Sequence, residues 1–145
     1  MPFRFPLATV LRVREITEKR EERMLQKIQT EIAQVLLQVE ELTAAIVHVH
    51  DIRERAMQVP IPAGQLHSLL WEADAIIDRK KSLVRHLELL EQKREEQVAT
   101  YQAAHRAREM LTDMLKRQRD AYDQESARRQ QRQLDDLFVA RHYRS

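Results

Sequence analysis

The chain has 145 residues, of which 33% are charged and 5% aromatic, with a single glycine and no cysteine. Because a compact domain needs frequent turns, this composition argues against a globular fold and favours long helices, and disulfides are excluded. The net charge of +2 is too small to indicate nucleic-acid binding from bulk charge.

The first predicted element is a helix over about residues 6–58. Pro6 suits the first helical turn, where its missing N–H costs nothing. Within this helix the heptad pattern slips between Thr17 and Met24, because Glu18 and Glu21 occupy places that the heptad would make apolar. We therefore expect either a stutter in the heptad pattern or a looser, more solvated contact there.

The strictest pattern in the chain follows, in steps of three and four residues. A helix with one such apolar stripe requires a partner helix. The positions, here called the seam, are Leu25, Ile28, Ile32, Val35, Val39, Leu42, Ile46 and Val49.

A turn is predicted at 59–64, where Pro60 and Pro62 disfavour helix in the residues before them and the only glycine, Gly64, follows. A second helix is predicted over about 65–141, with its clearest core positions at Leu83, Leu87 and Leu90. A break within 70–80 is an alternative, which would leave 65–77 as a separate short helix.

The predicted fold is therefore all-α: two long helices in an antiparallel coiled-coil hairpin that forms one elongated domain over 1–145. Paired residues should have numbers that add to about 124. The second helix is longer than the first, so its last residues should form an overhang rich in arginine. The pattern permits both a hairpin closed within one chain and one swapped between two chains.

The sequence offers little for catalysis. It has no glycine-rich phosphate-binding loop and no cysteine nucleophile, and a rod provides no cleft that would tune a side chain. His48 and His50 point to opposite sides of a helix, so they cannot chelate together. We expect no enzyme activity, no cofactor and no metal site, with the histidines at the surface.

Trp71 follows the turn and has two interpretations: packing at the hairpin tip, which we favour, or an exposed binding anchor. The C-terminal arginines lack interleaved aromatic residues, so a single-strand nucleic-acid surface is not expected. No apolar run approaches the roughly 18 residues that span a bilayer. We expect a soluble, cytoplasmic protein.

The two ends of the chain carry a family resemblance. Near the start, the pattern F-x-F-x-L-x-x-V-L-x-x-R-E is matched by Phe3, Phe5, Leu7, Val10, Leu11, Arg14 and Glu15. Near the end, a basic stretch precedes an acidic pair and an Ala-x-Arg-like ending, matched by Arg132, Leu134, Asp135, Asp136, Ala140 and Arg141. In both segments the chain resembles the FliJ family.

This resemblance implies a component of flagellar type III protein export, with the injectisome stalk proteins as close cousins. It implies an antiparallel coiled coil, similar to the central stalk of rotary ATP synthases, that binds the hexameric export ATPase without being an ATPase. It also implies contacts with the membrane export gate and with export chaperones, so the protein would reach the inner membrane only through partners.

From the resemblance and the charge of the two ends, we expect a set of residues to contribute to the ATPase contact: Phe3, Arg4, Phe5, Arg12, Arg128, Arg132 and Arg141. Gate-contact residues stay unassigned. Two other functions are open: a generic scaffolding coiled coil, and a basic helical protein that binds nucleic acid with steep salt dependence.

Overall fold

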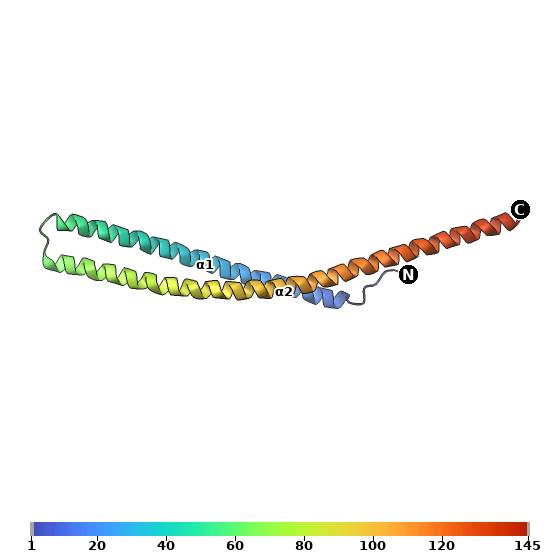
Figure 1. The fold of residues 1–145 in the computed structure, drawn as a ribbon, viewed down its shortest axis with the longest axis horizontal. Helices are drawn as coiled ribbons and strands as arrows, with labels where there is room; N and C mark the ends of the chain where they lie inside the picture. Colours follow the sequence, from blue (N-terminus) through green and yellow to red (C-terminus); the bar gives the residue numbers. More distant parts are fainter. Residues whose placement is uncertain (1, 145) are drawn as a thin grey trace. The chain divides into compact units, whose positions relative to one another are not determined.

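The computed structural model describes residues 2–144, which form two helices and, within that range, no strand. Helix α1 spans Ala8–Met57 and helix α2 spans Ala63–Arg144 (Figure 1). Helix α1 starts after a turn in which the Ala8 amide donates to the Phe5 carbonyl at 3.2 Å. Pro6 therefore lies just before the helix instead of within it.

The connection between the helices is short and is built on proline. The Gln58 amide donates to the Arg55 carbonyl at 3.2 Å as α1 ends, and the Gln65 amide donates to the Pro62 carbonyl at 3.0 Å as α2 begins. Gly64 lies inside the first turn of α2 and does not have a positive φ. The chain therefore reverses without using the conformational freedom of glycine.

Helix α2 runs without interruption from Ala63, so the alternative of a separate helix at 65–77 is not found. Trp71 lies in this continuous stretch with 76% of its surface exposed. The prediction that Trp71 packs at the tip was therefore wrong. Its two preceding neighbours, Leu69 and Leu70, are half-buried, so Trp71 lies on the solvent side of the helix.

The chain divides into two compact units. Unit 2 covers 21–100, and unit 1 combines 1–20 with 101–145. In unit 2 the two helices run antiparallel on either side of the turn (Figure 1). Its buried core is formed by Ile32, Val35 and Leu90, and the half-buried residues packed against it are Ile28, Val39, Leu83 and Leu87.

This core confirms the predicted antiparallel arrangement of two long helices. Every seam residue from Leu25 to Val49 is buried or half-buried, whereas Leu36 and Leu37, which lie off the seam, are exposed. Burial therefore follows heptad position and not hydrophobicity alone. The side chain of His86 on α2 lies 3.7 Å from that of Glu31 on α1, so the two helices also contact each other through polar side chains.

Glu21 is the buried polar residue of unit 2, with 8% of its surface exposed. The Gln97 side-chain amide donates to the Glu21 carboxylate at 2.6 Å and to the Glu21 carbonyl at 3.1 Å. The prediction of a solvated contact was wrong at this position. Glu21 is buried, and its hydrogen bonds with Gln97 form a polar layer where the heptad pattern would place apolar side chains. Burying the carboxylate is tolerable only because it has these partners.

In unit 1 the first turns of α1 pack against α2 at Leu11, which is 9% exposed, and at the half-buried Leu111 and Leu115. Beyond Ser126 every described residue of α2 is exposed. The predicted C-terminal overhang is therefore present within unit 1.

Candidate functional site

The residues expected to contact a partner come from both ends of the chain, and all of them lie in unit 1. Unit 1 also contains the uncovered end of α2. An uncovered helix end beside the other end of the same chain is a natural place for a partner protein to bind.

Phe3 and Phe5 are half-buried. The ring of Phe3 packs on the ring of Tyr122 with a centroid distance of 5.5 Å and a tilted geometry. Such an aromatic pair adds to the burial of apolar area. Phe3 therefore ties the segment before α1 to α2, and its part in partner binding remains a prediction.

The arginines of the expected site are exposed, but they do not form one face. Arg128 and Arg132 are four residues apart on α2 and lie on the same side of the helix. Arg141 follows Arg132 by nine residues, which is half a turn more than two full turns, so it lies on the opposite side. Arg4 lies in the segment before α1, and Arg12 is exposed on α1 itself.

A charged cluster between the helices holds unit 1 together. The Arg108 guanidinium donates from Nε to Glu18 Oε2, and His105 Nδ1 lies 3.2 Å from Glu18 Oε1. The other ring nitrogen of His105 lies 3.6 Å from Glu109. The Glu18 side chain is only 15% exposed. Its carboxylate is therefore largely shielded from solvent and surrounded by cationic or hydrogen-bonding groups.

These contacts change the acidity of both partners. The hydrogen bond from Arg108 lowers the pKa of Glu18 below its ordinary value of 4.5, with a smaller effect from His105, and outweighs the opposing effect of burial. The same hydrogen bond from Glu18 raises the pKa of Arg108. Both groups are therefore charged at neutral pH, and the cluster is an ion pair.

Comparison with known proteins decides the family. The family described as "FliJ: Flagellar FliJ protein" matches residues 3–145. The chain belongs to the FliJ family. This match confirms the resemblance drawn from the two ends and makes the chain a flagellar export-related protein. No curated protein and no solved structure matches it.

This FliJ-family chain also carries an apolar stripe that the sequence reasoning did not single out as a site. Leu134, Leu137 and Phe138 are 62%, 60% and 71% exposed, and with Asp135 and Arg141 they line a hollow of about 420 Å³. Their spacing of three, one and three residues places Leu134, Leu137, Phe138 and Arg141 on one helix face. This spacing is the feature of the sequence from which the apolar stripe could have been predicted.

The ion pair of Glu18 and Arg108 was also missed, although Glu18 was recognised as a polar interruption of the heptad pattern. Pairing the polar interruptions of one helix with those of the other would have suggested it. Their numbers add to 126 and those of Glu18 and His105 to 123, close to the predicted 124. The expectation of a solvated contact at Glu18 was therefore wrong.

Within residues 2–144, no group of three or more His, Asp or Glu side chains is placed to hold a metal ion. Helix α1 contains one 18-residue stretch that could cross a membrane by length and composition alone. Some of its apolar residues belong to the seam that packs against α2 in unit 2, but only 17% of the stretch is buried, and Leu36, Leu37 and Val47 of α1 are exposed.

Proposed function

We propose that this FliJ-family protein is the central-stalk-like component of flagellar type III export, and that unit 1 binds the hexameric export ATPase. In this proposal the chain works as one elongated hairpin over 1–145, in the cytoplasm at the inner membrane. It links the ATPase to the membrane export gate and the export chaperones, and it reaches the membrane only through those partners.

One observation carries the proposal. The family match covers both ends of the chain, and unit 1 leaves the last turns of α2 entirely exposed from residue 127 onward. This uncovered helix carries an apolar stripe of three large residues together with the arginines of the expected site. Exposed apolar patches rimmed by charge are typical of protein interfaces.

The two sides of the uncovered helix suit a ring-shaped partner better than a flat one. The face with Arg128 and Arg132 and the face with Leu137 and Arg141 point in opposite directions. A partner that surrounds the helix contacts both faces at once, whereas a partner on one side contacts only one. Charge would steer the encounter, and the apolar stripe would supply desolvated contact area.

The test is binding of a purified flagellar export ATPase to the full chain and to a variant with Arg128, Arg132 and Arg141 changed to Glu. We expect the reversal to weaken binding by about tenfold or more, because three rim charges become repulsive. Helicity measured by circular dichroism should not change, since these arginines are exposed and lie outside the packed core.

The matched control reverses three exposed cations of unit 2, namely Arg23, Lys27 and Arg79, which gives the same change in net charge. This control should bind like the unmodified chain. Equal binding of the ATPase by all three proteins would contradict the proposal that unit 1 is the ATPase-binding part of the chain. If the unmodified chain does not bind the ATPase at all, the scaffolding alternative is favoured, and DNA affinity that falls steeply with salt would favour the nucleic-acid alternative.

A further inference from the structure

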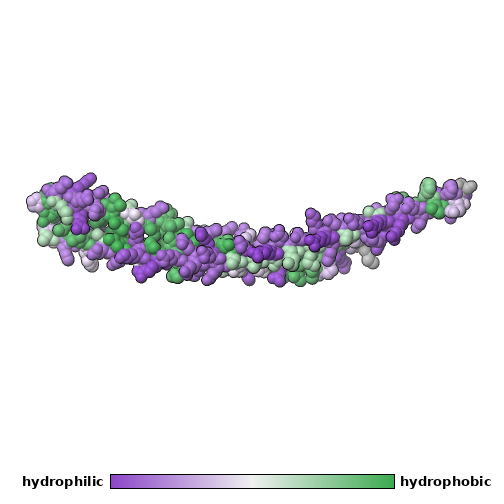
Figure 2. Space-filling view, viewed as in Figure 1, coloured by the Kyte–Doolittle hydropathy of each residue, from purple (hydrophilic) through white to green (hydrophobic). Residues whose placement is uncertain are grey.

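Unit 2 has a shallow groove near the turn that the ATPase proposal does not use. Two adjoining hollows of about 670 and 140 Å³ share Ile46 and Ile77 in their linings. Figure 2 shows hydrophobic surface gathered over this part of unit 2, among hydrophilic side chains. The groove is therefore bordered on α1 by the seam residue Ile46, and it opens to solvent along α2.

The floor of the groove follows a heptad repeat of its own. Leu70, Ile77 and Val84 recur every seven residues on α2, each one position beyond the residues that face α1. All three are half-buried, and the α1 residue that borders both hollows, Ile46, is half-buried as well. A hairpin of two helices needs only the two seam positions per heptad, and a third apolar position is typical of helices that pack against two neighbours.

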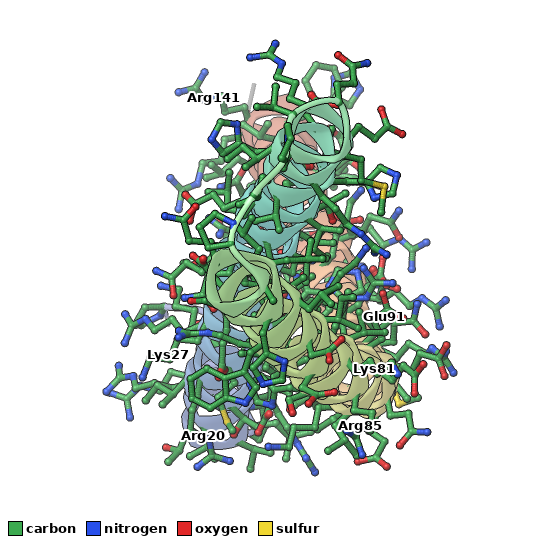
Figure 3. All side chains as sticks on the ribbon, turned by 90° about the vertical axis from the view of Figure 1, so that its left-hand side faces the viewer. Arg20, Lys27, Lys81, Arg85, Glu91 and Arg141 are labelled. Carbon is green, nitrogen blue, oxygen red and sulfur yellow. The ribbon has the colours of Figure 1, made fainter. Side chains whose placement is uncertain are left out.

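The lining of the groove is cationic. Lys80, Lys81 and Arg85 line the larger hollow with no acidic residue, and Arg53 and Asp74 line the smaller one. Among the described residues, no carboxylate lies within ion-pair distance of Lys80 or Lys81. In Figure 3, Lys81 and Arg85 project on the same side of unit 2, and Lys27 projects on the other side.

We propose that this groove is the docking site for an acidic amphipathic helix of a partner protein. The apolar face of such a helix would cover Ile77 and Val84 and complete a three-helix bundle over this segment. Its carboxylates would pair with Lys81 and Arg85, whose charges lie at the rim, while the partly covered Lys80 contributes its aliphatic stem to the floor.

Charge decides between this occupant and a second copy of the chain. Two copies joined groove to groove would bring the same cations together, and like charges across an interface are repulsive. An acidic helix meets the same cations with attraction. The acidic Glu88 and Glu91 follow Arg85 along α2, so the cationic stretch ends there, and the docked helix should end near the same point.

The probe is a fluorescent synthetic amphipathic helix of about 20 residues, which spans roughly 30 Å, with leucine on one face and glutamate on the flanks. Its binding to the full chain is measured by fluorescence anisotropy. We expect saturable binding that Lys81→Glu with Arg85→Glu weakens by about tenfold or more. A peptide with the same composition in scrambled order should not bind, because it has no continuous apolar face.

The matched control is Arg23→Glu with Lys27→Glu, which changes two exposed cations of unit 2 outside the groove. It should bind the acidic peptide like the unmodified chain. Equal weakening by both pairs, or equal binding of the scrambled peptide, would overturn the proposal. A dimer in sedimentation velocity that Val84→Glu dissociates would assign the groove to a second copy instead. No export ATPase is present, so failure here leaves the proposed function standing.

Discussion

Leu89 and Leu90 are neighbours in α2 with opposite surroundings. Leu90 is 2% exposed in the core of unit 2, whereas Leu89 is 58% exposed. Leu90→Ala should lower the free energy of unfolding by about 2–4 kcal/mol, because it removes buried methyl groups and leaves a cavity. Leu89→Ala should change it by no more than about 0.5 kcal/mol. Urea unfolding followed by circular dichroism measures both, and equal losses would contradict the assigned core.

The ion pair of Glu18 and Arg108 gives unit 1 a pH-dependent contribution to stability. Because the pKa of Glu18 in the folded chain lies below its ordinary value of 4.5, the contribution is fully present above that pH. It is lost as the pH falls through the lowered pKa. Glu18→Gln should therefore cost roughly 1–2 kcal/mol at pH 7, a value that allows for the partial exposure of Arg108.

The measurement compares unfolding of Glu18→Gln and the unmodified chain from pH 7 to pH 3. The difference between them should shrink as the pH falls below about 4.5, because protonated Glu18 and glutamine are then alike in charge. A difference that stays constant over this range would show that the carboxylate charge does not stabilise unit 1.

At the residue scale, the apolar contacts were predictable, and the polar contacts were predictable only in part. Heptad spacing specifies which positions face the partner helix, so Ile32, Val35 and Leu90 follow from the pattern. A long polar side chain can reach a partner that lies more than one helical turn away from the residue directly opposite it on the other helix. Glu21 and Gln97, for example, have numbers that add to 118 instead of 124. Which side chains pair is therefore decided by their length and rotamers, which the pattern does not contain.

At the scale of the helices, Gly64 provides a test of how the hairpin turns. It lies in the first turn of α2 without a positive φ, and a Cβ placed there would meet no atom within 4 Å. Gly64→Ala should therefore raise the free energy of unfolding by up to about 0.5 kcal/mol, because alanine loses less backbone entropy in a helix. Thermal unfolding measures this, and a lowered midpoint would mean that the turn needs the glycine.

The helices themselves were largely predictable from the positions of proline and from the spacing of apolar residues. The two prolines near the turn mark where the chain reverses, and α2 contains no proline after Pro62 to interrupt it. The alternative of a break within 70–80 is not found, and the additional stripe of Leu70, Ile77 and Val84 continues through that range on an uninterrupted helix. The spacing of apolar residues alone does not distinguish an additional stripe from a helix break.

At the scale of the whole molecule, the two units differ in what they leave exposed. Unit 2 has the apolar core and a cationic groove, and unit 1 has the ion pair and an uncovered helix end. The family was predictable because its pattern lies at the two ends of the chain. The exposed stripe at Leu134, Leu137 and Phe138 required the structure, since only the packing shows that nothing within unit 1 covers it.

The most direct test of the proposed stalk function is the ATP turnover of a purified flagellar export ATPase, measured with increasing amounts of the full chain. A stalk that binds inside the ring favours the assembled hexamer, so turnover should rise to a plateau as the hexamer fraction rises in sedimentation. Unchanged turnover and unchanged assembly at saturating amounts of the chain would contradict the proposed function.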